Sequence, residues 1–170
     1  MTIRTWPSGC TRLLAAREFV GEGADGRALF RATSEWMILD KHGSRPRNLS
    51  RMDLHLPPTG LKVLSTELQR LQRTPTPYTR AGTISVPFSA LDFNGHVNNT
   101  EYVRWAFDSL HRLLGHTPPA RSVQVTYTAE VFEGDEVEVL VAAEQGAPIR
   151  VVEHKAREAA DTSVFLMEIE

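Results

Sequence analysis

One amphipathic segment, from about Asn99 to Leu114, constrains the fold of this chain more than any other feature of its sequence. Apolar residues recur along it at helical spacing and would form one face: Val103, Ala106, Phe107, Leu110, Leu113 and Leu114. Gly115 and Pro118 follow, which is typical of a helix end. Strand-like segments surround the helix, one before it and four after it: 80–92, 120–132, 135–145, 149–158 and 162–170. This order predicts an α+β domain in which an antiparallel sheet wraps one long central helix.

The first 40 residues predict strands without a helix. Three strand-like segments are separated by turn signals at 7–9 and 23–26, and the polar stretch 41–46 would end the meander: 1–9, 11–23 and 27–40. Asp25-Gly26 is a good hairpin turn because both residues tolerate a positive φ. A three-stranded sheet must bury its apolar face against something. This block is therefore incomplete by itself, and its cover is expected from downstream or from another chain.

Residues 49–79 predict a connector. Pro57-Pro58 on one side and Pro75 and Pro77 on the other bracket a stretch with leucines at helical spacing: Leu61, Leu64, Leu68 and Leu71. We expect one short amphipathic helix there, as core cover or linker. The expected domain organisation is a partial domain at 1–48, a proline-bounded linker with a short helix at 49–79, and a complete domain at 80–170.

Composition places the chain among ordinary globular proteins. With 170 residues, of which 41% are hydrophobic and 24% charged, it is long enough for one domain or about one and a half small ones. The net charge of −2 argues against a nucleic-acid binder with a global basic field. Cys10 is the single cysteine, so no intrachain disulfide can form, which fits a reducing cytosol. Without an apolar run of ~20 residues or a signal pattern, we expect a soluble, cytoplasmic protein with no membrane span.

Immediately before the helix, the chain gathers polar side chains that turn chemistry alone does not explain. Asn98 or Asn99 is a natural helix cap and Asn94-Gly95 is a natural turn, but Asp92 and His96 remain without a role. A carboxylate, an amide and an imidazole at i, i+2 and i+4 can converge in a compact loop. They would lie beside the N–H groups of a helix N-terminus, which can bind a developing oxyanion. The cluster therefore indicates carbonyl chemistry, which needs a base, an orienting group and an oxyanion site.

A metal site is the weaker interpretation of the same region. Asp92, His96, His111 and His116 could be ligands, but His111 lies more than three helical turns beyond the loop. No HExxH motif or cysteine set accompanies them. We expect neither a metal nor another cofactor.

The stretch from Asp92 to Trp105, D-F-N-G-H-V-N-N-x-x-Y-x-x-W, resembles the second hotdog domain of the acyl-ACP thioesterases. These are plant and bacterial enzymes that release fatty acids from acyl carrier protein, and their pattern here is D-x-N-x-H-V-N-N-x-x-Y. Four earlier segments resemble the later strands of the family's first hotdog and the segment after them: 5–9, 16–19, 32–40 and 45–49. The resemblance implies one complete hotdog, at 80–170, preceded by a partial copy without its first strand and helix.

By position, Asp92, Asn94 and His96 match the family's catalytic residues, and Glu130 matches its catalytic glutamate. Val131 stands where plant members have a cysteine, which argues against a cysteine-based scheme. The resemblance implies water attack on a fatty acyl thioester, with Asp92 and Glu130 as base and partner in an order that stays open. Asn94 and His96 would orient the thioester or the water. The oxyanion would be held by the backbone N–H groups near the helix start: Val97, Asn98 and Asn99.

Glu130 also stands out by its position alone. In the strand expected at 120–132 its parity is opposite to that of Val125, Tyr127 and Val131, so it would face solvent or a site.

The expected activity is hydrolysis of acyl-ACP, which releases a free fatty acid in fatty acid biosynthesis. The expected partner is acyl carrier protein with its fatty acyl chain, and no nucleic acid. A further copy of the chain could cover the partial block, so we expect a homo-oligomer. Two alternatives stay open: a single-hotdog-type acyl-CoA thioesterase that acts as a dimer, and a non-catalytic hotdog that binds acyl chains or carrier protein.

Overall fold

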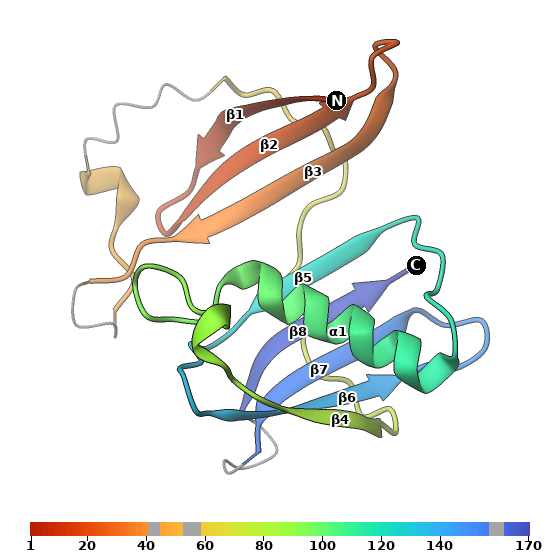
Figure 1. Ribbon diagram of the computed structural model, residues 1–170. Helices are drawn as coiled ribbons and strands as arrows, with labels where there is room; N and C mark the ends of the chain where they lie inside the picture. Colours follow the sequence, from red (N-terminus) through yellow and green to blue (C-terminus); the bar gives the residue numbers. More distant parts are fainter. Residues whose placement is uncertain (41–44, 53–58, 157–161) are drawn as a thin grey trace. The chain divides into compact units, whose positions relative to one another are not determined.

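Figure 1 shows a computed structural model that describes residues 1–40, 45–52, 59–156 and 162–170. The chain forms two compact units, Met1–Leu68 and Gln69–Glu170. Their boundary falls inside the expected connector, and the expected three-part domain organisation stays a prediction.

The first unit contains a three-stranded antiparallel sheet in the order β1-β2-β3, which confirms the strands expected from the sequence. The strands are Thr2–Cys10 (β1), Leu14–Glu22 (β2) and Ala28–Met37 (β3), and a short 3-10 turn follows at Leu49–Arg51. The turn between β2 and β3 is also confirmed. Gly26 has a φ of 77°, and its N–H donates to the Gly23 carbonyl over 3.1 Å.

The turn expected at 7–9 is wrong. Strand β1 continues through it with a register shift between Pro7 and Gly9, and the chain reverses between Cys10 and Leu14. The buried hydroxyl of Ser8 donates to the buried Glu18 carboxylate over 2.7 Å, which holds this part of β1 in the sheet. Of the stretch expected to end the meander, 41–44 lies outside the described residues.

The prediction of a helix in the connector is also wrong, since residues 59–78 contain no helix. Two of their N–H groups donate to side chains far along the chain. Val63 N–H donates to Glu18 over 3.2 Å in the first unit, and Leu71 N–H donates to the Thr126 hydroxyl over 3.2 Å in the second. A short isolated helix is marginal in water, so tertiary hydrogen bonds of this kind outweigh the leucine spacing.

The second unit is a five-stranded antiparallel sheet in the order β4-β6-β7-β8-β5, with one helix, α1, across one face (Figure 1). Its elements are β4 (Thr79–Ser85), a 3-10 turn (Phe88–Ala90), α1 (Asn99–Leu114), β5 (Val123–Tyr127), β6 (Glu136–Ala142), β7 (Ile149–Lys155) and β8 (Ser163–Ile169). The predicted order of one strand, one helix and four strands is confirmed. Strand β4 lies at an edge, and Pro87 follows its end, where a missing N–H costs no ladder bond.

Helix α1 begins and ends where its local signals predict. The Asn98 side chain accepts the Thr100 N–H at 3.0 Å, and Gly115 closes the helix in the left-handed conformation at a φ of 76°. Its buried face is rotated relative to the predicted one. Leu113 is exposed, and Tyr102, Trp105 and Ser109 are buried beside the predicted Ala106 and Leu110.

The core of the second unit lies between this face of α1 and the inward side chains of the sheet. The inward side chains are mostly β-branched or aromatic: Val137, Val139, Val141, Val151, Phe165 and Met167. Each buried side chain of this size contributes about 1.5–3 kcal/mol to folding. The sheet is therefore a rigid support for the loops at its ends.

The strand expected at 120–132 is shorter, since β5 ends at Tyr127. Beyond Thr128, the backbone binds the segment between β4 and α1 rather than β8. Val131 C=O accepts the Val97 N–H at 2.9 Å, and Asp135 C=O accepts the Val86 N–H at 3.0 Å. Glu130 therefore lies in a loop, and the parity argument for its direction does not apply.

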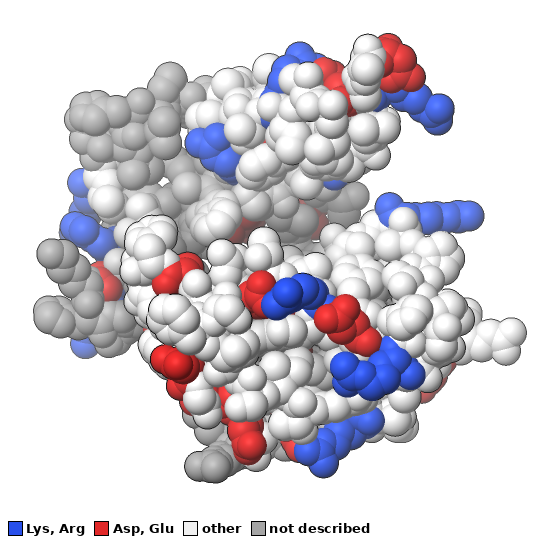
Figure 2. All heavy atoms as spheres, in the orientation of Figure 1, with Lys and Arg blue, Asp and Glu red and all other residues white. Residues whose placement is uncertain are grey.

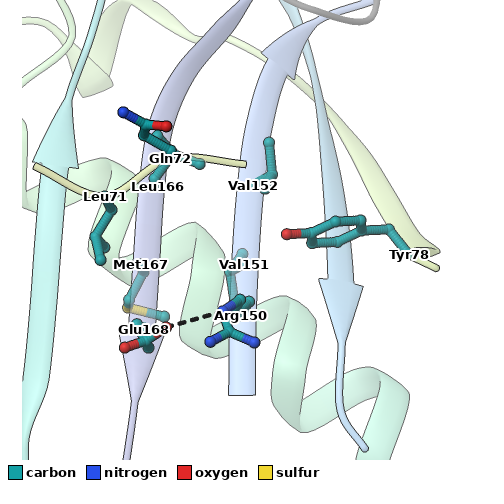
Figure 3. Close-up of a pocket in the computed structure, with 9 residues that line it drawn as sticks. All are labelled: Leu71, Gln72, Tyr78, Arg150, Val151, Val152, Leu166, Met167 and Glu168. Atoms are coloured by element: carbon teal, nitrogen blue, oxygen red, sulfur yellow. Dashed lines mark hydrogen bonds and ion pairs between the residues drawn. The ribbon is translucent and has the colours of Figure 1, made fainter. Parts of the chain in front are cut away.

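The outer face of the same sheet carries a shallow hollow beneath the segment before β4 (Figure 3). Leu71, Gln72 and Tyr78 border it, and an ion pair of 2.8 Å between Arg150 and Glu168 crosses it. None of the predicted site residues lines this hollow.

Candidate functional site

The residues between Leu91 and Val97, called the site loop from here on, form a closed turn just before α1. Leu91 and Val97 pair as an isolated β-bridge. Asp92 N–H donates to the His96 carbonyl over 2.7 Å, and Gly95 N–H donates to the Asp92 carbonyl over 3.1 Å. Gly95 has a φ of 80°, which a side chain would strain. The loop is therefore compact enough to bring alternate side chains together.

Asp92 organises this loop. Its Oδ1 accepts N–H bonds from Asn94 at 2.8 Å and His96 at 3.3 Å, and its Oδ2 accepts the Asn94 amide at 3.4 Å. Desolvation alone would raise the pKa of Asp92, but these hydrogen bonds and the His96 imidazole outweigh it and lower the pKa. The carboxylate is thus ionised at neutral pH, and its lowered pKa makes it a weaker base.

His96 and Glu130 meet across the loop. His96 Nδ1 lies 3.5 Å from Glu130 Oε1, a loose ion-pair distance, and their side chains are 36% and 57% exposed. The Val97–Val131 hydrogen bond joins the backbones directly after both residues. The structure therefore brings together Asp92, Asn94 and His96 within one loop and adds Glu130 from a loop distant in sequence.

Two of the three N–H groups expected to hold an oxyanion are occupied. Val97 N–H donates to Val131 C=O and Asn98 N–H donates to Ala90 C=O, both over 2.9 Å. These bonds close the site loop, so neither group is open to a ligand in this structure. Asn99, the first residue of α1, is the member of the set that carries no such bond in the described part of the chain.

Val131, at the position of the cysteine in plant family members, is fully buried in the core. A side chain at this position points away from the solvent-accessible site. Valine carries no nucleophilic group, so this residue cannot attack a thioester.

Sequence reasoning missed an aromatic contact at the site. The centroid of the Phe132 ring lies 5.2 Å from the centroid of the His96 imidazole, with the two planes at 88°. The Lys155 ammonium lies 5.5 Å from the same Phe132 centroid. Phe132 follows Glu130 by two residues, so its nearness could have been suspected. Nothing in the sequence joins Lys155, at the end of β7, to the site loop.

Sequence reasoning also missed Glu153, which is fully buried on β7. It is paired with Val139 on one side and Phe165 on the other, both of them core residues that pack beneath α1. Neither carboxyl oxygen has a hydrogen-bond partner within the described residues, and desolvation raises its pKa well above the ordinary value.

The described residues contain no group of three or more His, Cys, Asp or Glu side chains placed to hold a metal ion. In the same part of the chain, no helix has the length and apolar character needed to span a membrane. Acidic and basic side chains alternate over the visible face of α1 (Figure 2), where Arg104 pairs with Glu101. That face therefore carries mixed charge rather than one basic patch.

Comparison with solved structures supports the fold. An acyl-ACP thioesterase from Bacteroides thetaiotaomicron matches with a TM-score of 0.77 and 21% identity, over 98% of this chain and 66% of that chain. The 12:0-ACP thioesterase from Umbellularia californica matches with a TM-score of 0.76 and 18% identity, over 99% and 66%. The α+β hotdog fold expected from the sequence is thereby confirmed.

Comparison with sequences supports the family. The chloroplastic oleoyl-acyl carrier protein thioesterase of Coriandrum sativum is 25% identical over an alignment of 156 residues that covers 84% of this chain. This chain spans 42% of the length of that relative. The family model for the acyl-ACP thioesterase C-terminal domain matches residues 76–170, which is more than half of the chain and includes every candidate site residue. The chain therefore belongs to the acyl-ACP thioesterase family.

Proposed function

We propose that this chain hydrolyses fatty acyl thioesters, with acyl-ACP favoured over acyl-CoA, and releases free fatty acid. The observation that carries the proposal is the contact between His96 and Glu130 above a loop that the Asp92 carboxylate holds closed. A thioester carbonyl is already electrophilic, so a positioned water and a general base are sufficient for its hydrolysis. Membership of the family supports the same reaction class.

The structure favours an order of roles that the sequence leaves open. Glu130 is more than half exposed, so its carboxylate can reach a bound water and act as the general base. Both oxygens of Asp92 accept hydrogen bonds from the site loop, and the pKa of Asp92 is lowered, so Asp92 acts as the organiser of that loop. His96 orients the Glu130 carboxylate through the 3.5 Å contact.

The proposed reaction has two steps. Glu130 takes a proton from water while the water oxygen bonds to the thioester carbonyl carbon, and the Asn99 N–H stabilises the oxyanion that forms. The intermediate then expels the thiolate as the C–S bond breaks, and the thiolate takes the proton from Glu130. The exposed Asn94 amide would orient the acyl carbonyl. The products are a fatty acid and a free thiol.

Acyl carrier protein is the partner that this proposal favours, because the matching relatives are named for acyl-ACP substrates. A cytoplasmic enzyme of fatty acid biosynthesis that works as a homo-oligomer stays a prediction.

The test compares the wild type with Glu130→Gln, and Glu133→Gln serves as the control because Glu133 is an exposed neighbour outside the site. Release of fatty acid and thiol is measured on a panel of acyl-ACPs and on the matching acyl-CoAs. We expect Glu130→Gln to lose at least about 10²-fold in kcat and the control to lose nothing.

Three other outcomes are informative. A loss below threefold in a folded Glu130→Gln variant would remove Glu130 from the mechanism. Faster turnover of the acyl-CoAs would favour the single-hotdog-type activity. Binding of acyl-ACP without any turnover would favour the non-catalytic role.

A further inference from the structure

We propose that Phe132 is a positioning residue, whose ring holds the His96 imidazole toward Glu130 and is itself held by Lys155 and Asp135. This inference rests on the proposed function, because it assigns a role in the same reaction. Phe132, Asp135 and Lys155 all lie outside the stretch from Asp92 to Trp105 that supplied most of the site.

The need for such a residue follows from how little else holds the imidazole. The His96 backbone is tied to Asp92, but its side chain is 36% exposed and its partner Glu130 is 57% exposed. A contact of 3.5 Å between two such side chains does not by itself select one ring orientation.

Phe132 provides a second contact from a different direction. Its ring centroid lies 5.2 Å from that of His96, with the planes at 88°, which is the edge-to-face arrangement that aromatic pairs favour. The imidazole therefore contacts the Glu130 carboxylate and the Phe132 ring together. Rotation of the imidazole would lose both contacts.

Phe132 is itself 43% exposed, so its ring also needs support. The Lys155 ammonium lies 5.5 Å from the ring centroid, at a distance suited to a cation–π contact. Asp135 Oδ2 lies 3.0 Å from Lys155 Nζ and also accepts the Phe132 N–H at 3.0 Å. One carboxylate oxygen thus holds both the backbone of Phe132 and the cation over its ring.

The support extends into the sheet. Lys155 is the last residue of β7 and pairs with Val137, a fully buried residue of β6, while Asp135 directly precedes β6. Desolvation alone would raise the pKa of Asp135, but the Phe132 N–H and Lys155 outweigh it and lower the pKa, so the carboxylate is ionised at neutral pH. The paired strands β6 and β7 therefore hold the Phe132 ring in place, and the Phe132 ring holds the His96 imidazole.

The first test separates orientation from substrate binding. Phe132→Leu should lower kcat about three- to tenfold with KM unchanged, because the edge contact is lost while the residue stays apolar. Phe132→Tyr keeps the aromatic ring, so its kcat should match that of the wild type. Lys155→Met should give a smaller loss, which Lys155→Arg should reverse because a guanidinium also stacks on aromatic rings. Phe88→Leu is the matched control, since Phe88 is 76% exposed in the 3-10 turn outside the site.

The second test asks whether the effect passes through His96. In a His96→Ala background, Phe132→Leu should cause no further loss of kcat, because the group that it positions is gone. An equal loss in both backgrounds would overturn the inference and leave Phe132 with a purely structural role. So would a failure of Phe132→Tyr to restore kcat.

A spectroscopic measurement keeps the inference separate from the proposed function. In protein with isotopically labelled histidines, the imidazole proton signals of His96, assigned with His96→Ala, should carry a ring-current shift that Phe132→Leu removes and Phe88→Leu retains. Absence of that shift in the wild type would overturn the inference. If the shift is present but no thioester is turned over, the contact stands while the proposed reaction fails.

Discussion

At the scale of single residues, Asp92 shows that a motif position and a chemical role are different things. The sequence marks it as a catalytic carboxylate, and the structure directs both its oxygens at Asn94 and His96 in the same loop. A carboxylate that accepts backbone N–H bonds is stabilised in its charged form. The same bonds that order the loop make Asp92 a poorer base than a carboxylate without them.

We therefore expect Asp92→Asn and Asp92→Ala to differ. The asparagine Oδ1 can still accept the two N–H bonds, so Asp92→Asn should stay within about tenfold of wild-type kcat/KM, whereas Asp92→Ala should lose at least about 10²-fold. The measurement is steady-state hydrolysis of one acyl-ACP, with circular dichroism to show that both variants fold. Equal losses of 10²-fold or more would instead make Asp92 the base.

At the scale of elements, β7 places the carboxyl group of Glu153 in the apolar core between the sheet and α1. Glu153 lies between Val139 and Phe165, with no hydrogen-bond partner in the described structure. Its raised pKa means that the folded protein holds this proton more tightly than the unfolded chain does. The stabilising effect of that proton is complete below the ordinary glutamate value and is lost as the pH rises above it.

Glu153→Gln should accordingly change stability in a pH-dependent way. Near pH 4 the neutral acid and the amide are alike, so the free energy of unfolding should be almost unchanged. Above about pH 4.5, the advantage of the variant should grow by up to about 1.4 kcal/mol per pH unit until the buried carboxyl titrates. Urea unfolding across this range is the measurement, and Glu133→Gln is the exposed control. A difference that is constant with pH would show that Glu153 has the same pKa in the folded and the unfolded protein.

Helix α1 offers a second prediction at this scale. The Asn98 side chain accepts both the N–H and the hydroxyl of Thr100, at 3.0 and 2.8 Å, and so caps the helix that follows the site loop. Asn98→Ala should lower the free energy of unfolding by about 1 kcal/mol, whereas Asn98→Ser should retain most of it. Thermal or urea unfolding of the two variants measures this, and equal stability of all three proteins would remove the cap as a source of stability.

At the scale of the whole molecule, the sheet of the first unit has exposed apolar side chains on one of its faces. Ile3, Phe30 and Trp36 lie on one face of it, since Ile3 and Phe30 both pair with Gly21 and Trp36 has the parity of Phe30. All three are exposed. Apolar side chains gathered on one sheet face are typical of a surface that another segment or chain covers.

We expect the protein to associate through this face. Light scattering coupled to size-exclusion chromatography should give a mass above that of one chain, and the double substitution Phe30→Ser and Trp36→Ser should shift it toward the monomer. Leu61→Ser is the control, because Leu61 is an exposed apolar residue outside this sheet. A monomeric wild type at high protein concentration would contradict the expectation.

The sequence by itself determined the features that depend on residues close along the chain. The bounds of α1 follow from a cap at Asn98, a glycine at Gly115 and the apolar spacing between them, and all of these act within a few residues. The site loop was predictable for the same reason, because Asp92, Asn94 and His96 bind one another within five residues. Alternating strand patterns and one long helix were enough for the α+β class.

The tertiary structure decided where backbone N–H groups and side chains find distant partners. The connector lost its expected helix because Val63 and Leu71 donate to side chains far along the chain. The N–H groups of Val97 and Asn98 close the site loop, because they donate to the carbonyls of Val131 and Ala90 and are not open to an oxyanion in this structure. The support of His96 by Phe132 and Lys155 likewise exists only after β6 and β7 pair. Local patterns cannot specify such partners, because a hydrogen bond or ring contact depends on distance in space and not on separation in sequence.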